Sequence, residues 1–149
     1  MLDVGADAPA FELANQNGEA VSLDEFEGRV VVYFYPRADT PGCTTEARGF
    51  RDAWDAFEER DVAVLGISDD SVEDLADFAS EYDLPFELLS DPDGEVAAAY
   101  DSYGEKTIGG NTFDGTFRNT YVVEDGRIAA AYEGVSPEGH AEEILADLE

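Results

Sequence analysis

The apolar run at residues 29–35, Arg-Val-Val-Val-Tyr-Phe-Tyr, constrains the fold more than any other feature of this sequence. A short run of β-branched and aromatic residues is typical of a strand buried on both faces. Residues 62–68 predict a second buried strand. Residues 41–60 predict a helix between them, with one apolar face formed by Ala47, Phe50, Trp54 and Phe57. Strands alternating with helices indicate an α/β fold with a mixed sheet.

The remaining segments continue this alternation along the chain. We expect an edge strand at 11–13, strands at 86–89, 116–123 and 127–132, and helices at 23–26, 70–82, 96–100 and 138–148. Asp70 and Ser71 are expected to cap the helix that follows them. No linker, low-complexity tract or internal repeat interrupts the pattern, so we expect residues 1–149 to form a single domain.

Two Gly- and Asp-containing runs predict loops rather than binding sites. The run Gly109-Gly110-Asn111 predicts a flexible loop near the entrance of a site, because no Lys-Ser or Lys-Thr follows to make a phosphate loop. Asp91-x-Asp93-Gly94 resembles a fragment of a calcium loop, but the remaining ligand spacing is missing. We therefore interpret it as a turn.

The acidic excess describes the surface of a folded chain. There are 36 acidic and eight basic residues, a formal net charge of -28, together with nine Phe and seven Tyr that a disordered acidic chain would lack. Such a surface repels nucleic acid and anionic membranes. It is typical of adaptation to a high-salt cytoplasm, where ions screen the self-repulsion, although an ordinary acidic protein remains the alternative. We expect structure to be lost at low ionic strength.

The N-terminus and the cysteine count set further expectations. The first residues carry no basic segment followed by an apolar one, and the longest apolar run is too short to span a bilayer, so we expect a cytoplasmic protein without membrane contact. One cysteine excludes an internal disulfide and an all-cysteine metal site, and the single His140 adds little ligand capacity. We expect no metal and no cofactor.

The segment from residue 34 to residue 46 places that cysteine at a helix start. The strand ends at Tyr35 and Pro36 breaks its ladder, at the sheet edge where α/β proteins gather their ligand sites. Thr40 is a suitable N-cap and Pro41 a suitable first helical residue. Cys43 then lies in the first turn, where free backbone N–H groups and the positive end of the helix dipole stabilise a thiolate.

The local charge also favours a reactive thiol. Three of the eight basic residues, Arg37, Arg48 and Arg51, lie close to Cys43 in the sequence. The alternative for a lone cysteine is a small buried hydrophobe. The polar flanks, Thr-Pro-Gly-Cys-Thr-Thr-Glu, make that alternative weaker here.

The pattern Pro36-x-x-x-Thr40-x-x-Cys43 resembles the active-site signature of peroxiredoxins. The longer string Phe-Tyr-Pro-Arg-Ala-Asp-Thr-Pro-Gly-Cys-Thr-Thr-Glu is similar to the bacterioferritin comigratory, or Q-type, subgroup. The resemblance extends over nearly the whole chain, including Gly5-x-x-Ala-Pro-x-Phe, Leu88-Leu-Ser-Asp-Pro-Asp and Thr116-Phe-Arg-Asn-Thr-Tyr-Val-Val. It implies a thioredoxin-like fold, with which the predicted order of elements is compatible, and a peroxidase that reduces hydrogen peroxide or organic hydroperoxides for antioxidant defence.

The resemblance also implies a role for each matching residue. Cys43 corresponds to the nucleophile that attacks peroxide, and Thr40 to the hydroxyl that bonds the thiolate and the peroxide. Pro36 corresponds to the residue that shields the site, and Arg118 to the arginine that orients peroxide and stabilises the thiolate. Glu46 is expected either to support an arginine or to serve as an ordinary first-turn acid.

One departure from the subgroup concerns the resolving cysteine. Many members carry it five residues after the first cysteine, where this chain has Arg48. The resemblance therefore implies a one-Cys enzyme whose sulfenic acid is reduced by an external thiol, either a thioredoxin-like protein or a small thiol. Arg48 either attracts an anionic thiol or faces solvent. A monomer is expected, and a dimer is the alternative.

Two other functions use the same cysteine. A thioredoxin-like disulfide reductase needs Cys-x-x-Cys or Cys-x-x-Ser, but Glu46 occupies the fourth position here. That class also needs a proline near the strand facing the site, where this chain has Arg118 and no proline between Asp93 and Ser136. A redox sensor that uses Cys43 for signalling stays open.

Overall fold

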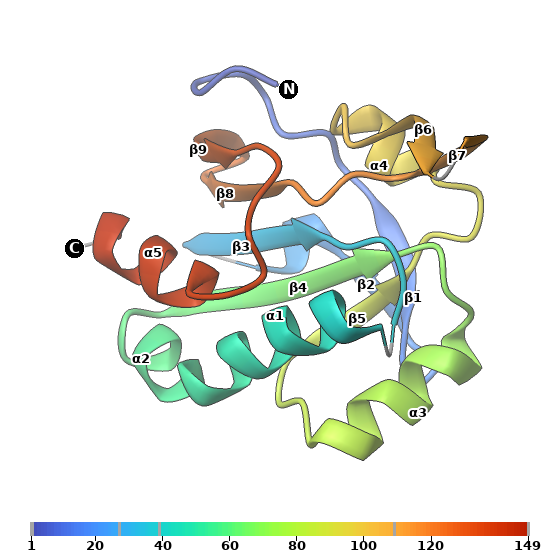
Figure 1. Cartoon of the computed structure of the whole chain (residues 1–149). Helices are drawn as coiled ribbons and strands as arrows, with labels where there is room; N and C mark the ends of the chain where they lie inside the picture. Colours follow the sequence, from blue (N-terminus) through green and yellow to red (C-terminus); the bar gives the residue numbers. More distant parts are fainter. Residues whose placement is uncertain (1, 27, 39, 109, 149) are drawn as a thin grey trace.

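A mixed sheet runs through the centre of the computed structural model, which describes residues 2–26, 28–38, 40–108 and 110–148 (Figure 1). Its strand order within the described residues is β2-β1-β5-β4-β3-β8-β9. The strands are β1 Glu12–Asn15, β2 Ala20–Ser22, β3 Arg29–Phe34, β4 Val62–Ser68, β5 Glu87–Ser90, β8 Thr120–Glu124 and β9 Arg127–Tyr132. β3, β4 and β5 are mutually parallel, and the other pairs are antiparallel.

The alternation of side chains along β3 builds one core on each face of the sheet. Val31 and Tyr33 face a layer formed by α1 Pro41–Asp52, α2 Trp54–Glu59, α3 Val72–Tyr82 and α5 His140–Asp147. Val30, Val32 and Phe34 face α4 Glu95–Ala99, the short η1 helix Leu23–Glu25 and the N-terminal segment. The predicted α/β architecture with helices on both faces is confirmed. No helix in the described part of the chain is long and apolar enough to cross a membrane.

The helix predicted at 41–60 is wrong in its continuity. It breaks at Ala53 (φ −96°, ψ 4°) into α1 and α2. The expected inward face is otherwise present, since Ala47, Phe50 and Phe57 are buried. Just after the break the ring of Trp54 lies 6.1 Å from that of Phe86, so packing against the sheet accompanies the departure from a straight helix.

The strand predicted at 116–123 is wrong at its beginning. β8 starts only at Thr120, and Thr116 ends a different strand. Between them the backbone bonds to three separate segments: the Phe117 N–H donates to Ser102 O, the Phe34 N–H to Asn119 O and the Val135 N–H to Arg118 O. Arg118 therefore lies on a bridging segment at the sheet edge, which the apolar pattern alone does not reveal.

Two further predictions need correction. The flexible loop predicted at 109–111 falls partly on Gly109, which lies outside the described residues. Around it, β6 Tyr103–Ile108 and β7 Asn111–Thr116 form an antiparallel hairpin, so Asn111 belongs to a strand. The strand predicted at 11–13 is β1, which is not at an edge. β2 folds back outside it through the turn at Asn17 and Gly18.

Candidate active site

Cys43 lies at the carboxyl edge of the sheet, on the helix that follows β3. The Tyr35 N–H still bonds to Ile67 O of β4, and the chain then leaves the ladder at Pro36. Thr40 has the extended backbone of an N-cap and Pro41 is the first residue of α1, as predicted. Cys43 follows in the first turn and is 2% exposed, with no disulfide. Its sulfur is thus held inside the molecule at a helix N-terminus.

An aspartate from the neighbouring strand edge shapes the loop before α1. Asp70 Oδ2 accepts hydrogen bonds from the Ala38 N–H (2.7 Å) and the Ser68 hydroxyl (2.7 Å). The prediction that Asp70 helps to cap α3 is therefore wrong. Ser71 caps that helix alone, since its Oγ accepts from the Asp74 N–H at 3.1 Å. The carboxylate of Asp70 instead ties the Cys43 loop to the end of β4.

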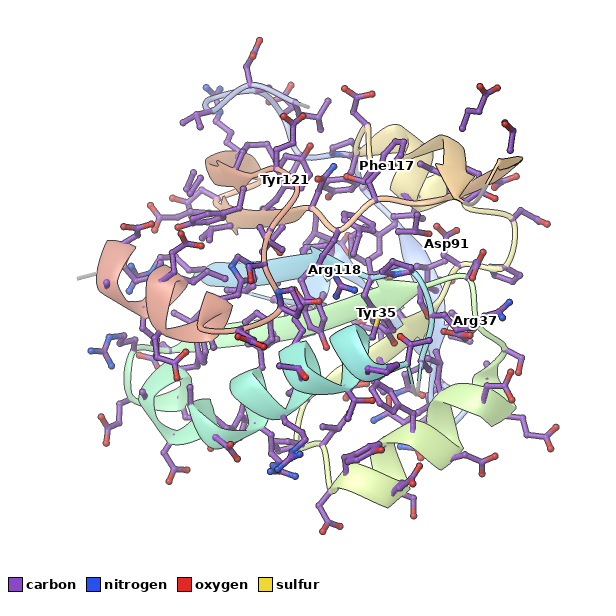
Figure 2. All side chains as sticks on the ribbon, in the orientation of Figure 1. Tyr35, Arg37, Asp91, Phe117, Arg118 and Tyr121 are labelled. Carbon is purple, nitrogen blue, oxygen red and sulfur yellow. The ribbon has the colours of Figure 1, made fainter. Side chains whose placement is uncertain are left out.

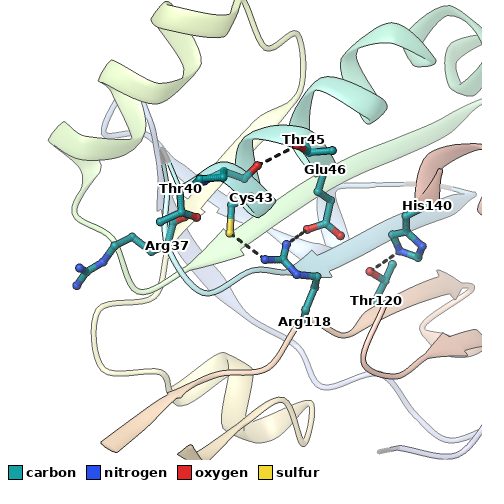
Figure 3. A network of polar contacts seen from close by, with 9 residues as sticks. Arg37, Thr40, Cys43, Thr45, Glu46, Arg118, Thr120 and His140 are labelled. Carbon is teal, nitrogen blue, oxygen red and sulfur yellow. Dashed lines mark hydrogen bonds and ion pairs between the residues drawn. The ribbon is translucent and has the colours of Figure 1, made fainter. Parts of the chain in front are cut away.

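Arg118 reaches the sulfur from a segment that lies across from α1 (Figure 3). One guanidinium nitrogen donates to Cys43 Sγ at 3.4 Å, and the other donates to Glu46 Oε1 at 2.8 Å. Burial lowers the pKa of Arg118, but Glu46 and Cys43 outweigh that effect and the net pKa is raised. The group is a permanent cation, and its two donors bridge a thiol and a carboxylate on one helix.

Glu46 is the buried partner of this arginine. Its residue is 1% exposed, Oε1 is bonded to Arg118, and no described residue bonds Oε2. Burial raises the pKa of the Glu46 carboxyl to about 7, and Arg118 opposes that rise. Of the two expected roles for Glu46, the contact supports the one in which it holds an arginine at the site.

The other two residues of the signature lie just after β3 and at the N-cap of α1, and their contacts do not show their expected roles. The Thr40 hydroxyl donates to Arg37 O at 2.9 Å and leaves its oxygen lone pairs free to accept a further bond. Pro36 is half-buried at the strand end, and all described peptide bonds are trans. The peroxide contacts implied for both residues stay predictions.

The three arginines near Cys43 in sequence do not supply the cation at the sulfur. The Arg37 side chain is exposed and points away from Sγ (Figures 2 and 3). Arg48 is exposed beside Asp52 and Glu138 in a groove between α1 and α5. Arg51 bonds Asp52 and Tyr82 O. The cation beside the sulfur comes instead from Arg118, 75 residues later in the chain.

Sequence reasoning missed two residues around Arg118. Asn119 is buried and donates to Ser102 Oγ at 3.0 Å. His140, dismissed as a weak ligand, is buried with both ring nitrogens in contact with polar partners (Figure 3). The available signals were the Asn beside Arg118 and the placement of the lone His at a helix start after Gly139.

The carboxylates near the site form no metal centre in the described residues. Within those residues, His, Cys, Asp and Glu side chains nowhere group in threes in a way that could hold an ion. The Asp91-x-Asp93-Gly94 run is a capped turn, as expected. The Asp91 carboxylate accepts from the Val96 N–H (3.2 Å) and the Ala97 N–H (2.9 Å) at the start of α4.

Comparisons with known proteins find relatives that match nearly the whole chain. Residues 4–131 match the AhpC/TSA family. Peroxiredoxin Bcp of Escherichia coli K12 is 43% identical over 97% of this chain and 94% of its own length. A Mycobacterium tuberculosis H37Rv protein described as a peroxiredoxin is 48% identical over 99% and 95%.

Solved structures of similar proteins superpose over nearly the whole chain. Xylella fastidiosa PrxQ gives a TM-score of 0.93 at 31% identity, over 99% of this chain and 96% of that one. The Xanthomonas campestris bacterioferritin comigratory protein, studied for alkyl peroxide reduction, gives 0.90 at 32%, over 98% and 97%. The predicted thioredoxin-like fold is confirmed.

Proposed function

The chain belongs to the AhpC/TSA family and is a peroxiredoxin of the Bcp, or Q-type, kind, and we propose that Cys43 is the nucleophile of its thiol-dependent peroxidase reaction. The observation that carries the assignment is the Arg118 guanidinium 3.4 Å from Sγ. A cation at this distance stabilises a thiolate and the charge that develops when an O–O bond breaks. Arg118 and Thr40 orient the peroxide, and Pro36 shields the sulfur.

The first half-reaction is a displacement at oxygen. The Cys43 thiol loses its proton, and the thiolate attacks one peroxide oxygen while the O–O bond breaks. Cys43 becomes a sulfenic acid, and the alkoxide or hydroxide that leaves takes up a proton to give an alcohol or water. The Arg118 N–H that bonds Sγ in the resting protein is close enough to donate to the leaving oxygen as negative charge develops there. Hydrogen peroxide and alkyl hydroperoxides both fit this step.

The second half-reaction needs a thiol from outside. The chain has one cysteine, so an external thiol condenses with the sulfenic acid to release water and form a mixed disulfide. A second thiol then releases Cys43 and leaves as the disulfide. Because Cys43 is 2% exposed, the first turn of α1 has to open before a thiol can reach the sulfur. A thioredoxin-like protein and a small thiol are both suitable reductants.

The test is single-turnover oxidation with one equivalent of hydrogen peroxide in high salt, with sulfenic acid trapped at Cys43, followed by a monothiol. We expect fast oxidation and repeated turnover, with Cys43→Ser inactive. If only a dithiol protein restores the Cys43 thiol, the reductant is a partner protein rather than a small thiol. If Cys43 reacts no faster than a free thiol, the proposed peroxidase function is wrong.

A redox sensor is the second candidate, because the buried sulfur and the absence of a second cysteine both slow re-reduction. The two functions separate on turnover. A sensor forms the sulfenic acid quickly and then keeps it for many minutes in the presence of excess thiol, whereas a peroxidase consumes many equivalents of peroxide.

The resolving-cysteine position gives a direct test of the local opening of α1. Residues five apart on a helix have Cα atoms about 8.7 Å apart, beyond the reach of a disulfide at roughly 7 Å. Arg48→Cys should therefore form an internal disulfide after peroxide treatment only when α1 opens. We expect two thiols lost per chain in the variant and one in the wild type. Loss of a single thiol in the variant would contradict the local opening of α1.

The acidic surface supports a role in a high-salt, reducing cytoplasm, where a free thiol can be regenerated. The acidic surface also supports a monomer, because two copies with a formal net charge of -28 each repel one another. The same charge disfavours binding to nucleic acid and to anionic membranes. We expect far-UV circular dichroism to show unfolding between molar and millimolar salt. An unchanged spectrum would contradict the salt requirement.

A further inference from the structure

The segment that carries Arg118 is fixed by side chains and loops rather than by a continuous strand. The two residues that flank Arg118 are each held by one backbone hydrogen bond. The Phe34 N–H donates to Asn119 O at 2.8 Å, and the Phe117 N–H donates to Ser102 O at 2.7 Å. The carbonyl of Arg118 itself accepts from Val135, in the loop between β9 and α5. The position of the guanidinium therefore depends on that loop.

The loop at residues 133–140 lies against both sides of the reaction centre. Its Gly134 N–H donates to Asn119 Oδ1 at 3.0 Å and its Val135 N–H to Arg118 O at 2.9 Å. A side-chain carbon at Gly42, next to Cys43, would lie 3.0 Å from the Arg118 guanidinium and 3.7 Å from Pro137. Arg118 is thus held closely between the first turn of α1 and this loop.

His140 anchors the end of the loop in the protein interior. It is 2% exposed, and its ring packs edge-on against Phe50 (5.9 Å) and Tyr132 (5.5 Å). Nε2 lies 2.9 Å from the Thr120 hydroxyl and Nδ1 lies 3.1 Å from Glu143 Oε1. Glu143 can only accept when ionised, so Nδ1 carries the proton and Nε2 accepts from Thr120.

We infer that His140 is a positioning residue for peroxide reduction: by accepting the Thr120 hydroxyl it fixes the chain two residues from Arg118, and so holds the guanidinium on Cys43. The inference rests on the proposed function of Cys43. Thr120 is the first residue of β8, pairs with Tyr33 of β3, and is fully buried, so the contact sets where the bridging segment enters the sheet. A displacement of that entry point moves Arg118 away from the sulfur.

Burial favours the neutral ring that this contact needs. Burial lowers the pKa of His140, and Arg118 lowers it further, while Glu143 on the same helix opposes both. Tyr132 faces the ring from β9, and Glu133 and Glu138 line the same cavity of about 350 Å³. When acid protonates the ring, Nε2 becomes a donor, so its bond to Thr120 has to reverse and the hydroxyl proton needs another acceptor. The positioning contact is then altered.

The test measures the second-order rate constant for oxidation of Cys43 by hydrogen peroxide in high salt, in four single variants and one double variant. Thr120→Val and His140→Phe remove the contact while keeping similar shapes, and we expect each to slow oxidation about tenfold, since small displacements of a positioned group are costly. The two losses should not add in the double variant. His140→Gln can accept from Thr120 and should recover most of the rate lost in His140→Phe. Tyr132→Phe, which removes only a surface bond to Asp147, serves as the control.

The pH dependence separates positioning from a structural role. Because this is the only histidine, its ring titration is read from a single set of imidazole signals by NMR. The ratio of the wild-type rate to the His140→Gln rate should fall as pH decreases, with the midpoint of that titration. A constant ratio, or folded Thr120→Val and His140→Phe proteins that react at the wild-type rate, would overturn the inference. If His140→Phe fails to fold, Thr120→Val decides. Slow wild-type oxidation would instead contradict the proposed function.

Discussion

The two faces of the sheet bury tyrosines in opposite ways. On the face covered by α4, the Tyr100 hydroxyl donates to Pro9 O and the Tyr121 hydroxyl to Tyr100 O, each at 2.7 Å. On the face covered by α1, the Tyr33 hydroxyl is buried with no partner among the described residues, and Glu46 Oε2 is in the same state. In Figure 2 the labelled Tyr121 and Arg118 lie in different layers of the molecule.

The unpaired groups lie on the face that carries Cys43. Burial raises the pKa of Tyr33 well above its ordinary value, and the charges of Glu46 and Cys43 contribute to the rise. A buried polar atom without a partner costs free energy, so a fold that retains one at its reactive site gives up stability there. One face of the sheet therefore pairs the buried hydroxyls of Tyr100 and Tyr121, whereas the other leaves buried polar atoms without a described partner around the charged site.

The largest expected effect comes from breaking the charged network itself. Arg118→Met removes both donors, leaving the Cys43 thiolate and Glu46 without a cation. We expect the rate constant for oxidation by hydrogen peroxide to fall by about 10²–10³, as it does when a donor to a developing anion is lost. Arg118→Lys should recover little of it, because one ammonium cannot span both partners. Stopped-flow oxidation of Cys43 measures the rates, and a loss below tenfold would contradict the assigned role.

Much of the fold could be predicted because hydrophobic periodicity is a local signal. Val62–Ser68 and 127–132 were predicted with correct bounds, since each is an apolar run between turn residues. The break at Ala53 could not be predicted, because it accompanies the contact of Trp54 with Phe86, a residue distant in sequence. The hairpin β6–β7 was missed since its strands are mostly polar and each contains a glycine.

The site divides in the same way. Cys43 at a helix N-terminus follows from local signals, namely Pro36, Thr40 and Pro41. The cation does not: the nearby arginines were the obvious candidates, and only the family resemblance pointed to Arg118. His140 and Asn119 act through contacts with segments far away in sequence, which no pattern within a short window contains. Local propensity thus predicts the nucleophile, and tertiary structure supplies its surroundings.

Glu46→Gln sharpens the comparison through pH. A carboxyl whose pKa rises from 4.5 unfolded to about 7 folded binds its proton more tightly in the folded state, so its stability is greatest in acid and falls as pH rises from 4.5 to 7. The ionised form then costs on the order of 3 kcal/mol as an upper bound. The free energy of unfolding of the variant minus that of the wild type should therefore increase between pH 5 and pH 8.

Urea titrations in high salt measure that difference. Working with the difference between two proteins removes the titration of the acidic surface, which both share. A difference that stays constant across this pH range would mean that Glu46 is ionised throughout and that Arg118 fully compensates for its burial. The comparison between the two faces would then rest on the unpaired tyrosine hydroxyls, such as that of Tyr33.

The smallest effect tests the tyrosines directly, with one variant on each face. Tyr33→Phe removes a buried hydroxyl that has no partner among the described residues, and we expect the free energy of unfolding to rise by about 1 kcal/mol or stay unchanged. Tyr121→Phe removes a hydroxyl that donates to Tyr100 O and accepts from the Leu2 N–H, and we expect a loss of about 1–2 kcal/mol. The two residues lie on paired strands and are equally buried, so the backbone surroundings are matched. An equal loss of unfolding free energy in the two variants would show that the Tyr33 hydroxyl has a partner in solution, such as an internal water. The free-energy cost of unpaired polar atoms near Cys43 would then be smaller than the contacts among the described residues indicate.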